Sequence, residues 1–572
     1  MNNKNKKAFY ITTTLPYVNS DPHIGHAMEF VRADIIARYK RSLGYDVFFN
    51  SGTDEHGSKI HEGAIKENMS TQEYVDKYSK RFKDFLKLAN ISNDEFVRTT
   101  DEKHILAAQE MWKRCHESGD IYKKNYKVKY CAGCELEKTD SELVDSKCAD
   151  HPNKEIEIRE EENYFFRYSK YQQKLLDFYS RSENKFVIPE SRQNEVKNFV
   201  ASGLQDFSIS RLKEKMPWGV AVPAGSCDEG DENKHVMYVW FDALTSYIST
   251  LGWPEGENKT SPASLSKREE EKSPESNFAK YWTQNQNLKS AESNLNTKRE
   301  VVQYCGKDNN RQQSAMWQAM LMSAELPNST NIVIDGFIQS GGVKMSKSIG
   351  NVISPFEIID EYKRTPLRSS FAGQETENKL ESEIKKEYLG TEYSEEVLRF
   401  VLCHEVSSFE DRDITHESIR TAYTAYLQNG IGNQVNRILK LSSTHLTLED
   451  IKIILEKAEQ GKLDVNYTKY LDEYKICEAT HVVTDKIKKL DEYIQSSEPF
   501  KLIKSDGGGD NVKAEQDKQR AVEIIKESVL SLCEIGHHFY FFMPRVSIDI
   551  YNHIKENKMP SAPLFGRVEN VI

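Results

Sequence analysis

The sequence predicts an α/β protein with a parallel sheet that is split by an insertion and followed by an all-α bundle. Strand-like runs alternate with helical runs through residues 8–118, which is the pattern of a parallel sheet covered by helices. From residue 121 to about 222 the pattern changes to a cysteine-bearing segment, after which strand-like runs resume. Beyond residue 415, apolar residues recur at helical spacing with few glycines. These observations favour a Rossmann-like sheet, an inserted module and a separate helical domain.

The individual strands of the predicted sheet can be placed from their apolar runs. Residues 9–14 read as a buried strand, after which two prolines break the chain and a helical pattern begins. Residues 47–49 form a second strand that leads to Asp54. Residues 235–240 and 301–306 are expected to resume the strands of the sheet. Ligands of such folds bind at the carboxyl ends of strands, so Asp54 lies at the expected binding edge.

Composition excludes some classes of protein. The 572 residues suffice for about four domain-sized units. The mean hydropathy of -0.68, and the absence of any apolar run near 18 residues, exclude a membrane span. Nine cysteines, several of them isolated, and a polar first segment suit the reducing cytoplasm. The net charge of -11 argues against a general polyanion binder, so any RNA must meet a local basic surface.

A motif for anion binding follows the first strand. His23-Ile24-Gly25-His26 places two imidazoles and a glycine at the start of a predicted helix. Unpaired backbone N–H groups and the helix dipole favour an anion there, and Gly25 leaves room for a nucleotide. The alternative is an ordinary helix cap with a surface histidine.

A second motif, about 320 residues later, offers two lysines in a glycine-flanked loop. Lys344-Met345-Ser346-Lys347-Ser348 follows a predicted strand at residues 331–335 and suits a mobile clamp on a polyphosphate. Taken alone, such a loop is usually just solvated. The order of the two motifs, and the strand before each one, together indicate a divided ATP site.

A cysteine and histidine motif in the insertion predicts a metal site. Cys131 and Cys134 are followed after 13 residues by Cys148 and then His151. Three thiolates and an imidazole in two short turns suit a tetrahedral structural zinc site with all four positions filled by protein. The alternatives are a disulfide, which the compartment disfavours, a redox Cys-x-x-Cys pair, which needs no second half, or chance.

The two nucleotide motifs together resemble the signature of class I aminoacyl-tRNA synthetases. Residues 14–17 (Thr-Leu-Pro-Tyr) and 52–57 (Gly-Thr-Asp-Glu-His-Gly) resemble the methionyl-tRNA synthetases in particular, in their form with a single zinc knuckle. The likeness runs, with interruptions, from about residue 8 to the Pro-Leu-Phe-Gly-Arg sequence at residues 563–567.

The resemblance and the patterns together imply five parts of the chain. They are the first half of the Rossmann catalytic domain (1–118), a connective insertion with the zinc knuckle (119–225), the second half of the catalytic domain (226–335, with a polar insert at 254–299), the lysine loop with a linker domain (336–412, with a polar insert at 364–388) and a helical anticodon-binding domain (413–572).

The resemblance assigns the ATP site. His23 and His26 hold phosphates, and Lys344 and Lys347 stabilise the departing pyrophosphate, so these four are the implied catalytic residues. Mg²⁺ accompanies the nucleotide. The implied ATP-binding set is His23, Gly25, His26, Gly306, Asp308, Lys344, Ser346 and Lys347.

The resemblance also assigns a methionine pocket. A carboxylate is needed for the ammonium group and an apolar, polarizable wall for the thioether. Asp54 takes the first role, and Leu15, Tyr17, Trp240, Ala243 and Tyr247 map onto the wall. Without the resemblance, Trp240 and Tyr247 read equally well as core aromatics. Gln313 stands where many relatives have a histidine, so the hydrogen bond it offers does not titrate near neutrality.

The helical domain carries candidate anticodon-reading residues. Asn433 and Arg437 are four apart in a helical pattern and so share a face, and Phe500 follows Pro499 at a helix boundary. An amide, a guanidinium and an aromatic ring suit the recognition of unpaired bases. Taken alone, they read as helix-surface polar residues and a packed phenylalanine. They match anticodon-reading positions of the resembled family, in which a tryptophan is more usual than phenylalanine.

The implied function is activation of L-methionine with ATP and transfer to the terminal adenosine of methionine tRNA, initiator tRNA included. One alternative is another class I synthetase: a cysteinyl enzyme would place zinc at its substrate, and a leucyl enzyme would carry a long editing insert. The other is a catalytically idle tRNA-binding relative, which should have lost His26 or Lys347. Because the chain ends soon after residues 563–567 without the appended dimerisation domain of some relatives, a monomer is expected.

Overall fold

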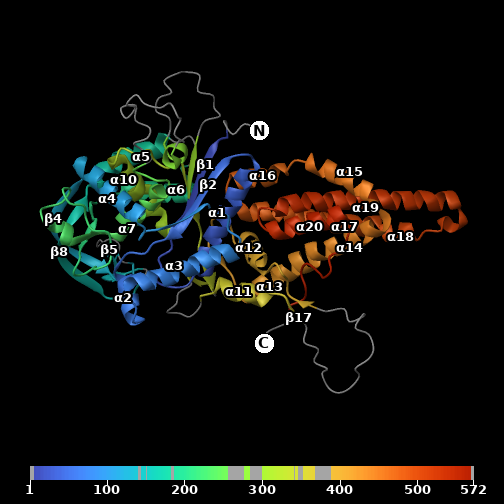
Figure 1. Cartoon of the computed structure of the whole chain (residues 1–572), viewed down its shortest axis with the longest axis horizontal. Coiled ribbons are helices and arrows are strands. Elements are labelled where there is room, and N and C mark those ends of the chain that lie inside the picture. The colour runs from blue at the N-terminus through green and yellow to red at the C-terminus, as the bar shows by residue number, and fades with distance from the viewer. Residues whose placement is uncertain are drawn as a thin grey trace, which may run out of the picture. The chain divides into compact units, whose positions relative to one another are not determined.

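The chain, described here by a computed structural model, forms two compact units (Figure 1). The first comprises Met1–Asp21, Gly44–Lys83 and Asn93–Ile334, and the second Pro22–Leu43, Asp84–Ser92 and Asp335–Ile572. The structure describes residues 6–134, 136–138, 143–149, 151–181, 186–255, 276–283, 299–340, 342–344, 352–366 and 388–568. Most of both predicted polar inserts lies outside these ranges, as do Ser346 and Lys347.

A six-stranded sheet forms the centre of the first unit, with the strand order β3-β2-β1-β13-β14-β9. β1 pairs in parallel with both β2 and β13, β2 with β3, and β14 with β9. All six residues of β1 are buried, as expected for a central strand with both faces covered. The prediction of a parallel α/β sheet split by an insertion is confirmed. The strands are β1 (Ala8–Thr13), β2 (Asp46–Thr53), β3 (Glu95–Arg98), β9 (Val187–Ile188), β13 (Glu300–Gly306) and β14 (Asn331–Asp335).

Helices and buried aromatic rings make the core beside this sheet. Trp112, Trp253, Trp282 and Trp317 are fully buried, and Trp317 meets Tyr247 edge-on with ring centroids 5.9 Å apart. Large aromatic rings supply much of the apolar area that such a core removes from water. The helices lying wholly or partly in this unit are α2 (Ser58–Lys66), α3 (Thr71–Leu88), α4 (Glu102–Glu117), α5 (Gln172–Arg181), α6 (Glu190–Ala201), α7 (Val239–Ala243), α8 (Ser246–Ser249), α9 (Asn277–Tyr281) and α10 (Trp317–Ser323).

The insertion contains an antiparallel sheet whose longest strands are β4 (Ile121–Cys131) and β8 (Ile156–Phe166), paired along their whole length. β5 (Leu136–Lys138) and β10 (Phe207–Ser208) complete the order β10-β8-β4-β5. The short strands β6 (Leu143–Val144) and β7 (Lys147–Cys148) pair between the end of β4 and the start of β8. Of the four metal-ligand candidates, Cys131 therefore ends β4, and the other three lie in the segment that connects β4 to β8. We call β4 and β8 together the β4–β8 ribbon.

The prediction that residues 235–240 resume the parallel sheet is wrong. β12 (His235–Met237) pairs antiparallel with β11 (Ser210–Leu212) in a separate two-stranded sheet, and Trp240 lies in helix α7. An apolar run of six residues does not distinguish a strand from a short buried helix, and here it holds both. The parallel edge strand β9 is only two residues long, too short to leave a sequence pattern.

The second unit combines α1 (Ile24–Ser42), a small mixed sheet and a helical bundle. The sheet has the order β16-β15-β19, from β15 (Ile338–Ser340), β16 (Val343–Lys344) and β19 (Arg412–Asp413). A two-stranded pair, β17 (Thr365–Pro366) with β18 (Tyr388–Leu389), lies between α11 (Pro355–Tyr362) and α12 (Ser394–His404) in the chain. Within this unit, buried Arg32 of α1 forms an ion pair with Asp335 at 3.0 Å and donates to Val406 O at 2.8 Å.

The bundle begins near residue 416 and confirms the prediction of an all-α region at this end of the chain. The longest helix, α19, packs against α14, α15, α17, α18 and α20 (orange to red in Figure 1). Among the described residues, none of the helices is both long and apolar enough to cross a bilayer. The bundle helices are α13 (His416–Ala422), α14 (Asn433–His445), α15 (Leu448–Glu459), α16 (Val465–Asp472), α17 (Ile476–Ser497), α18 (Pro499–Ile503), α19 (Asn511–Phe539) and α20 (Pro544–Glu556), with a π-helical stretch at Tyr423–Gly432.

Candidate functional site

Three neighbouring strands end at one edge of the parallel sheet, and the loops after them carry predicted site residues. The Thr14 amide donates to Tyr304 O at 3.1 Å, which joins the end of β1 to β13. The Asp54 amide donates to Pro16 O at 3.0 Å, so the loop after β1 also meets the loop after β2. Tyr17 and Asp54 thereby form an isolated parallel bridge. This edge is where a doubly wound sheet binds its ligands.

The loop after β2 approaches Tyr17 through a glycine. Gly57 has φ +124°, and a Cβ built there would lie 2.3 Å from the Tyr17 hydroxyl oxygen and 3.1 Å from Cγ2 of Val239. Any side chain at this position would push Tyr17 or the start of α7 away. Asp54, the predicted ammonium ligand, is 7 % exposed and lies three residues before this glycine.

The remaining wall candidates are all buried or half-buried. Leu15 and Ala243 are each 7 % exposed, whereas Trp240 is partly buried and packs against the main core of the unit.

Two of the predicted ATP-binding residues, Gly306 and Asp308, lie at the end of β13 or directly after it. The exposed Asp308 carboxylate accepts a hydrogen bond from the Asn309 side chain at 3.2 Å.

A buried polar chain joins two of the predicted methionine residues. The Gln313 amide donates to the Tyr247 hydroxyl, and its carbonyl oxygen accepts from the Gln303 amide. The Ser329 hydroxyl donates to Gln303 in turn. Gln313 is fully buried, and none of these groups ionises near neutral pH. At the position where many relatives have a histidine, the Gln313 amide is thus held by hydrogen bonds to Tyr247 and Gln303.

The histidine motif lies in the second unit and caps helix α1. The His26 amide donates to Nδ1 of His23, and the His23 amide to Nδ1 of His26, both at 3.3 Å. The two rings stack with centroids 3.6 Å apart. Because both Nδ1 atoms accept hydrogen bonds, the neutral rings carry their hydrogen on Nε2. Two Nε2–H donors therefore accompany a helix N-terminus, which already favours an anion.

The lysine motif belongs to the same unit. Lys344 ends the β15–β16 hairpin opposite Gln339, and Ser346 and Lys347 lie outside the described part of the chain. Just beyond that stretch, Ile353 O accepts from the Ile24 amide at 3.2 Å. Ile353, which follows the lysine motif in the chain, is therefore hydrogen-bonded to the first residue of α1, the helix that His23 caps.

The structure gathers the four predicted metal ligands. One ligand atom from each of Cys131, Cys134, Cys148 and His151 lies within 4.8 Å of the others. Sγ of Cys134 is 3.3 Å from Sγ of Cys148 and 3.2 Å from Nδ1 of His151. A Cβ on Gly133 would lie 2.3 Å from the His151 ring, so only glycine admits the imidazole there. Three sulfurs and one nitrogen form a donor set that fits a tetrahedral metal ion.

The three predicted RNA-reading residues all lie on the bundle. Asn433 begins α14 and is exposed, and Arg437 follows one turn later. The Arg437 guanidinium donates to the Asp491 carboxylate of α17 at 2.8 Å, with about a third of each side chain exposed. Phe500 of α18 is 41 % exposed. An exposed ring of this size is open to stacking.

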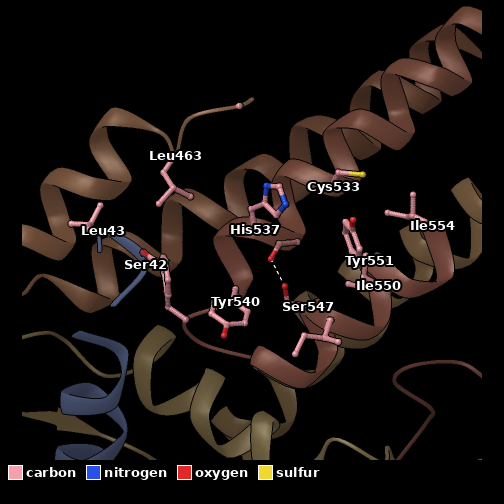
Figure 2. A pocket seen from close by; sticks show the side chains of 14 residues that line it. Ser42, Leu43, Leu463, Cys533, His537, Tyr540, Ser547, Ile550, Tyr551 and Ile554 are labelled. Carbon is pink, nitrogen blue, oxygen red and sulfur yellow. Dashed lines mark hydrogen bonds between the residues drawn. The ribbon is translucent and has the colours of Figure 1, made fainter. Parts of the chain in front are cut away.

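A cavity of about 460 Å³ opens elsewhere in the second unit. Figure 2 shows His537 of α19 and Tyr540, which directly follows that helix, beside it, with Ile550 and Tyr551 of α20. Burial raises the pKa of Cys533, another wall residue, to about 12, so that thiol is not a nucleophile near neutral pH. None of the predicted ATP, methionine, metal or RNA residues lines this cavity.

Several residues at the site were not predicted. The Trp218 indole donates to Glu55 O at 2.7 Å, beside Asp54. The Asp242 carboxylate contacts His56 and His104, which are 186 and 138 residues away in the chain. Such distances leave no local pattern, although His56 belongs to the motif at residues 52–57, two positions after Asp54.

Comparisons with known proteins match this chain to one family over most of its length. The family model described as tRNA synthetases class I (M) matches residues 9–149 and 131–384. A methionine–tRNA ligase of a Nostoc species is 33 % identical over 562 residues, covering 96 % of this chain and 91 % of the relative. One from Rickettsia typhi is 35 % identical over 462 residues, covering 81 % and 75 %.

Solved structures agree with the sequence relatives. The Mycobacterium tuberculosis methionyl-tRNA synthetase in complex with methionyl-adenylate superposes with a TM-score of 0.76, at 29 % identity and 99 % coverage of both chains. On the family match and these relatives, the chain, with its parallel sheet and helical bundle, belongs to the methionyl-tRNA synthetase family of class I tRNA synthetases.

Proposed function

We propose that this chain is a methionine–tRNA ligase. It activates L-methionine with ATP to methionyl-adenylate and transfers the methionyl group to the 3′-terminal adenosine of methionine tRNA, initiator tRNA included, releasing AMP and pyrophosphate. The observation that carries the proposal is the match to methionine–tRNA ligases over 96 % of the chain. The retention of His23, His26, Lys344 and Lys347 supports an active enzyme rather than an idle relative.

The activation step needs positioning and charge neutralisation rather than a protein nucleophile. The methionine carboxylate attacks the α-phosphorus of ATP, and negative charge spreads onto the departing pyrophosphate. The Nε2–H groups of His23 and His26 would donate to phosphate oxygens, with Gly25 leaving room. Lys344 and Lys347 would neutralise the pyrophosphate, supported by Ser346. Mg²⁺ bound with ATP would supply further positive charge at the phosphates.

The loops at the strand ends would hold the substrates. Asp54 would accept the methionine ammonium, a role that its burial and its bridge to Tyr17 support. Gly306 and Asp308, at the end of β13, would meet the nucleotide. The thioether would lie among apolar, hydroxyl and amide groups, from Leu15, Tyr17, Trp240, Ala243, Tyr247 and Gln313.

Zinc is the proposed occupant of the cysteine and histidine cluster. Three thiolates favour zinc among the common divalent metals, and four protein ligands leave no open position for chemistry. Bound there, the ion would hold the end of the β4–β8 ribbon together. Cys131, Cys134, Cys148 and His151 would be its only ligands.

The bundle would read the anticodon through Asn433, Arg437 and Phe500. The ion pair between Arg437 and Asp491 suggests that a base must compete with a carboxylate for the guanidinium. A net charge of -11 makes such local contacts more important than general attraction to RNA. We further propose the five-part domain division given above, a cytoplasmic location and a monomeric enzyme.

Amino-acid-dependent exchange of pyrophosphate into ATP tests the proposed function directly. All twenty amino acids are compared with the purified chain, and we expect methionine to support exchange far above the others. Charging of methionine tRNA then tests the transfer step. Exchange that depends on cysteine or leucine instead of methionine, or on none of the twenty, would refute the proposal.

A further inference from the structure

A buried carboxylate between two imidazoles lies next to the proposed methionine site and has no part in the steps above. Oδ2 of Asp242 is 2.7 Å from Nδ1 of His56, and Oδ1 is 2.9 Å from Nε2 of His104. Nδ1 of His104 is 3.0 Å from the Ser249 hydroxyl. All four residues are at most 5 % exposed. They come from the loop after β2, from α4, from α7 and from α8.

The hydrogen bonds of this cluster have a defined direction. Burial acts to raise the pKa of Asp242, but the His56 charge and the hydrogen bonds from both imidazoles outweigh it and leave the pKa at about 2. The carboxylate is therefore ionised and accepts an N–H from each ring. With its hydrogen on Nε2, a neutral His104 has an acceptor at Nδ1, 3.0 Å from the Ser249 hydroxyl, which also donates to Ser246 O at 3.4 Å. Both carboxylate oxygens of Asp242 and both ring nitrogens of His104 thus have a partner.

The cluster joins the two segments that carry the proposed methionine residues. His56 lies two positions after Asp54, and Asp242 lies between Trp240 and Ala243. Helix α7 has only five residues, so it holds its orientation through contacts rather than through its own hydrogen bonds. The two ends of the Asp242 carboxylate fix this helix to the loop after β2 and to α4.

We propose that Asp242 is a positioning residue for methionine, which sets the separation between the ammonium ligand and the side-chain wall through His56 and His104. The inference rests on the proposed function, because it takes Asp54, Trp240 and Ala243 as the methionine contacts. Substrate need not touch Asp242 itself. Misplacement of such contacts by about 1 Å can lower a rate roughly a hundredfold.

Replacement of the carboxylate separates positioning from general stability. Asp242→Ala removes both hydrogen bonds, and we expect it to raise the KM for methionine by roughly 10- to 100-fold in pyrophosphate exchange. The KM for ATP should change less than about twofold. Asp242→Asn keeps one acceptor for the N–H of His56 and gains one donor, which a neutral His104 can accept at Nε2 by exchanging its tautomer. We therefore expect Asp242→Asn to recover most of the loss.

A matched control is available in the same unit. Asp231 is also buried, accepting from the Tyr164 hydroxyl at 2.8 Å and pairing with Lys123 at 2.6 Å. No proposed substrate contact adjoins it. Asp231→Ala should therefore cost thermal stability comparably but leave the KM for methionine unchanged, as a purely structural role would.

A second pair of variants covers the case in which Asp242→Ala does not fold. His56→Leu removes one hydrogen bond, whereas His56→Asn places an amide N–H near the position of Nδ1 and should restore the methionine KM. The inference is overturned if Asp242→Ala or His56→Leu folds and keeps the wild-type methionine KM, or if either raises the KM for ATP equally. If wild type activates another amino acid, the proposed function fails, and the same comparison run on that amino acid still decides the positioning role.

Discussion

Glu396 should make the stability of the second unit depend on pH. This glutamate of α12 is fully buried, and its carboxyl oxygens accept from the amides of Arg545 at 2.7 Å and Val546 at 2.9 Å, at the start of α20. Burial raises its pKa from 4.5 to about 7, although the two backbone amides act to lower it. The folded chain therefore holds this proton more tightly than the unfolded chain does.

The sign and size of the effect follow from that difference. The contribution of Glu396 to the free energy of unfolding is fully present below pH 4.5 and is lost as pH rises through about 7. A difference of about 2.5 in pKa corresponds to about 3 kcal/mol. Glu396→Gln cannot ionise, but its NH₂ group cannot accept one of the two backbone hydrogen bonds, which costs about 1 kcal/mol. The variant should be less stable than wild type at pH 4, cross it near pH 5, and be more stable by about 2 kcal/mol at pH 8.

Thermal unfolding, followed by circular dichroism at several pH values from about 4 to about 8, measures this crossover. A change of about 3 kcal/mol shifts the melting temperature of a unit of this size by roughly 6–12 °C. Glu449, whose side chain is 72 % exposed, supplies a control. The melting temperature of the Glu449→Gln variant should change with pH in parallel with that of wild type. If the curves of Glu396→Gln and wild type are also parallel across this range, the carboxyl is not held protonated by burial and the reasoning is wrong.

Four further expectations can be checked independently. Lys347→Ala should slow adenylate formation far more than it weakens ATP binding in pre-steady-state kinetics, and equal losses would contradict its role with pyrophosphate. The purified chain should hold about one zinc ion, and X-ray absorption should show three sulfur ligands and one nitrogen ligand. The Cys148→Ser variant should lose the zinc ion, whereas the Cys227→Ser variant, changed outside the cluster, should keep it. Arg437→Ala should weaken charging of methionine tRNA, and discrimination against anticodon-swapped tRNA, with pyrophosphate exchange unchanged; Phe500→Ala should cost about 1–3 kcal/mol in tRNA binding if a base stacks there. Light scattering should give a monomer mass, and a dimer mass independent of concentration would overturn that expectation.

The features visible from sequence were those written into short stretches of chain. The buried run of β1, the helix after His23 and the spacing from Cys131 to His151 each carry their own pattern, and the structure places them accordingly. The change from strand to helix between Met237 and Val239 could not be predicted, because a short apolar run is compatible with both a buried strand and a buried helix.

Contacts between distant segments could not be predicted from such patterns. Asp491 lies 54 residues from its partner Arg437, and the sequence pattern of neither helix predicts this ion pair. The polar chain behind Gln313 likewise uses Gln303 and Ser329, which read as ordinary buried or loop residues until the fold joins them. Packing of segments that are remote in the chain decides these contacts.

The close approach of Gly133 to His151 has a consequence for recognising such sites in other chains. A pattern search counts the ligands and passes over the residue between the two cysteines. Yet a single methyl group at position 133 would fall 2.3 Å from the imidazole ring and force the fourth ligand away. A variant with all three cysteines and the histidine intact, but with alanine at this position, would score as a complete knuckle while lacking the space to close around an ion.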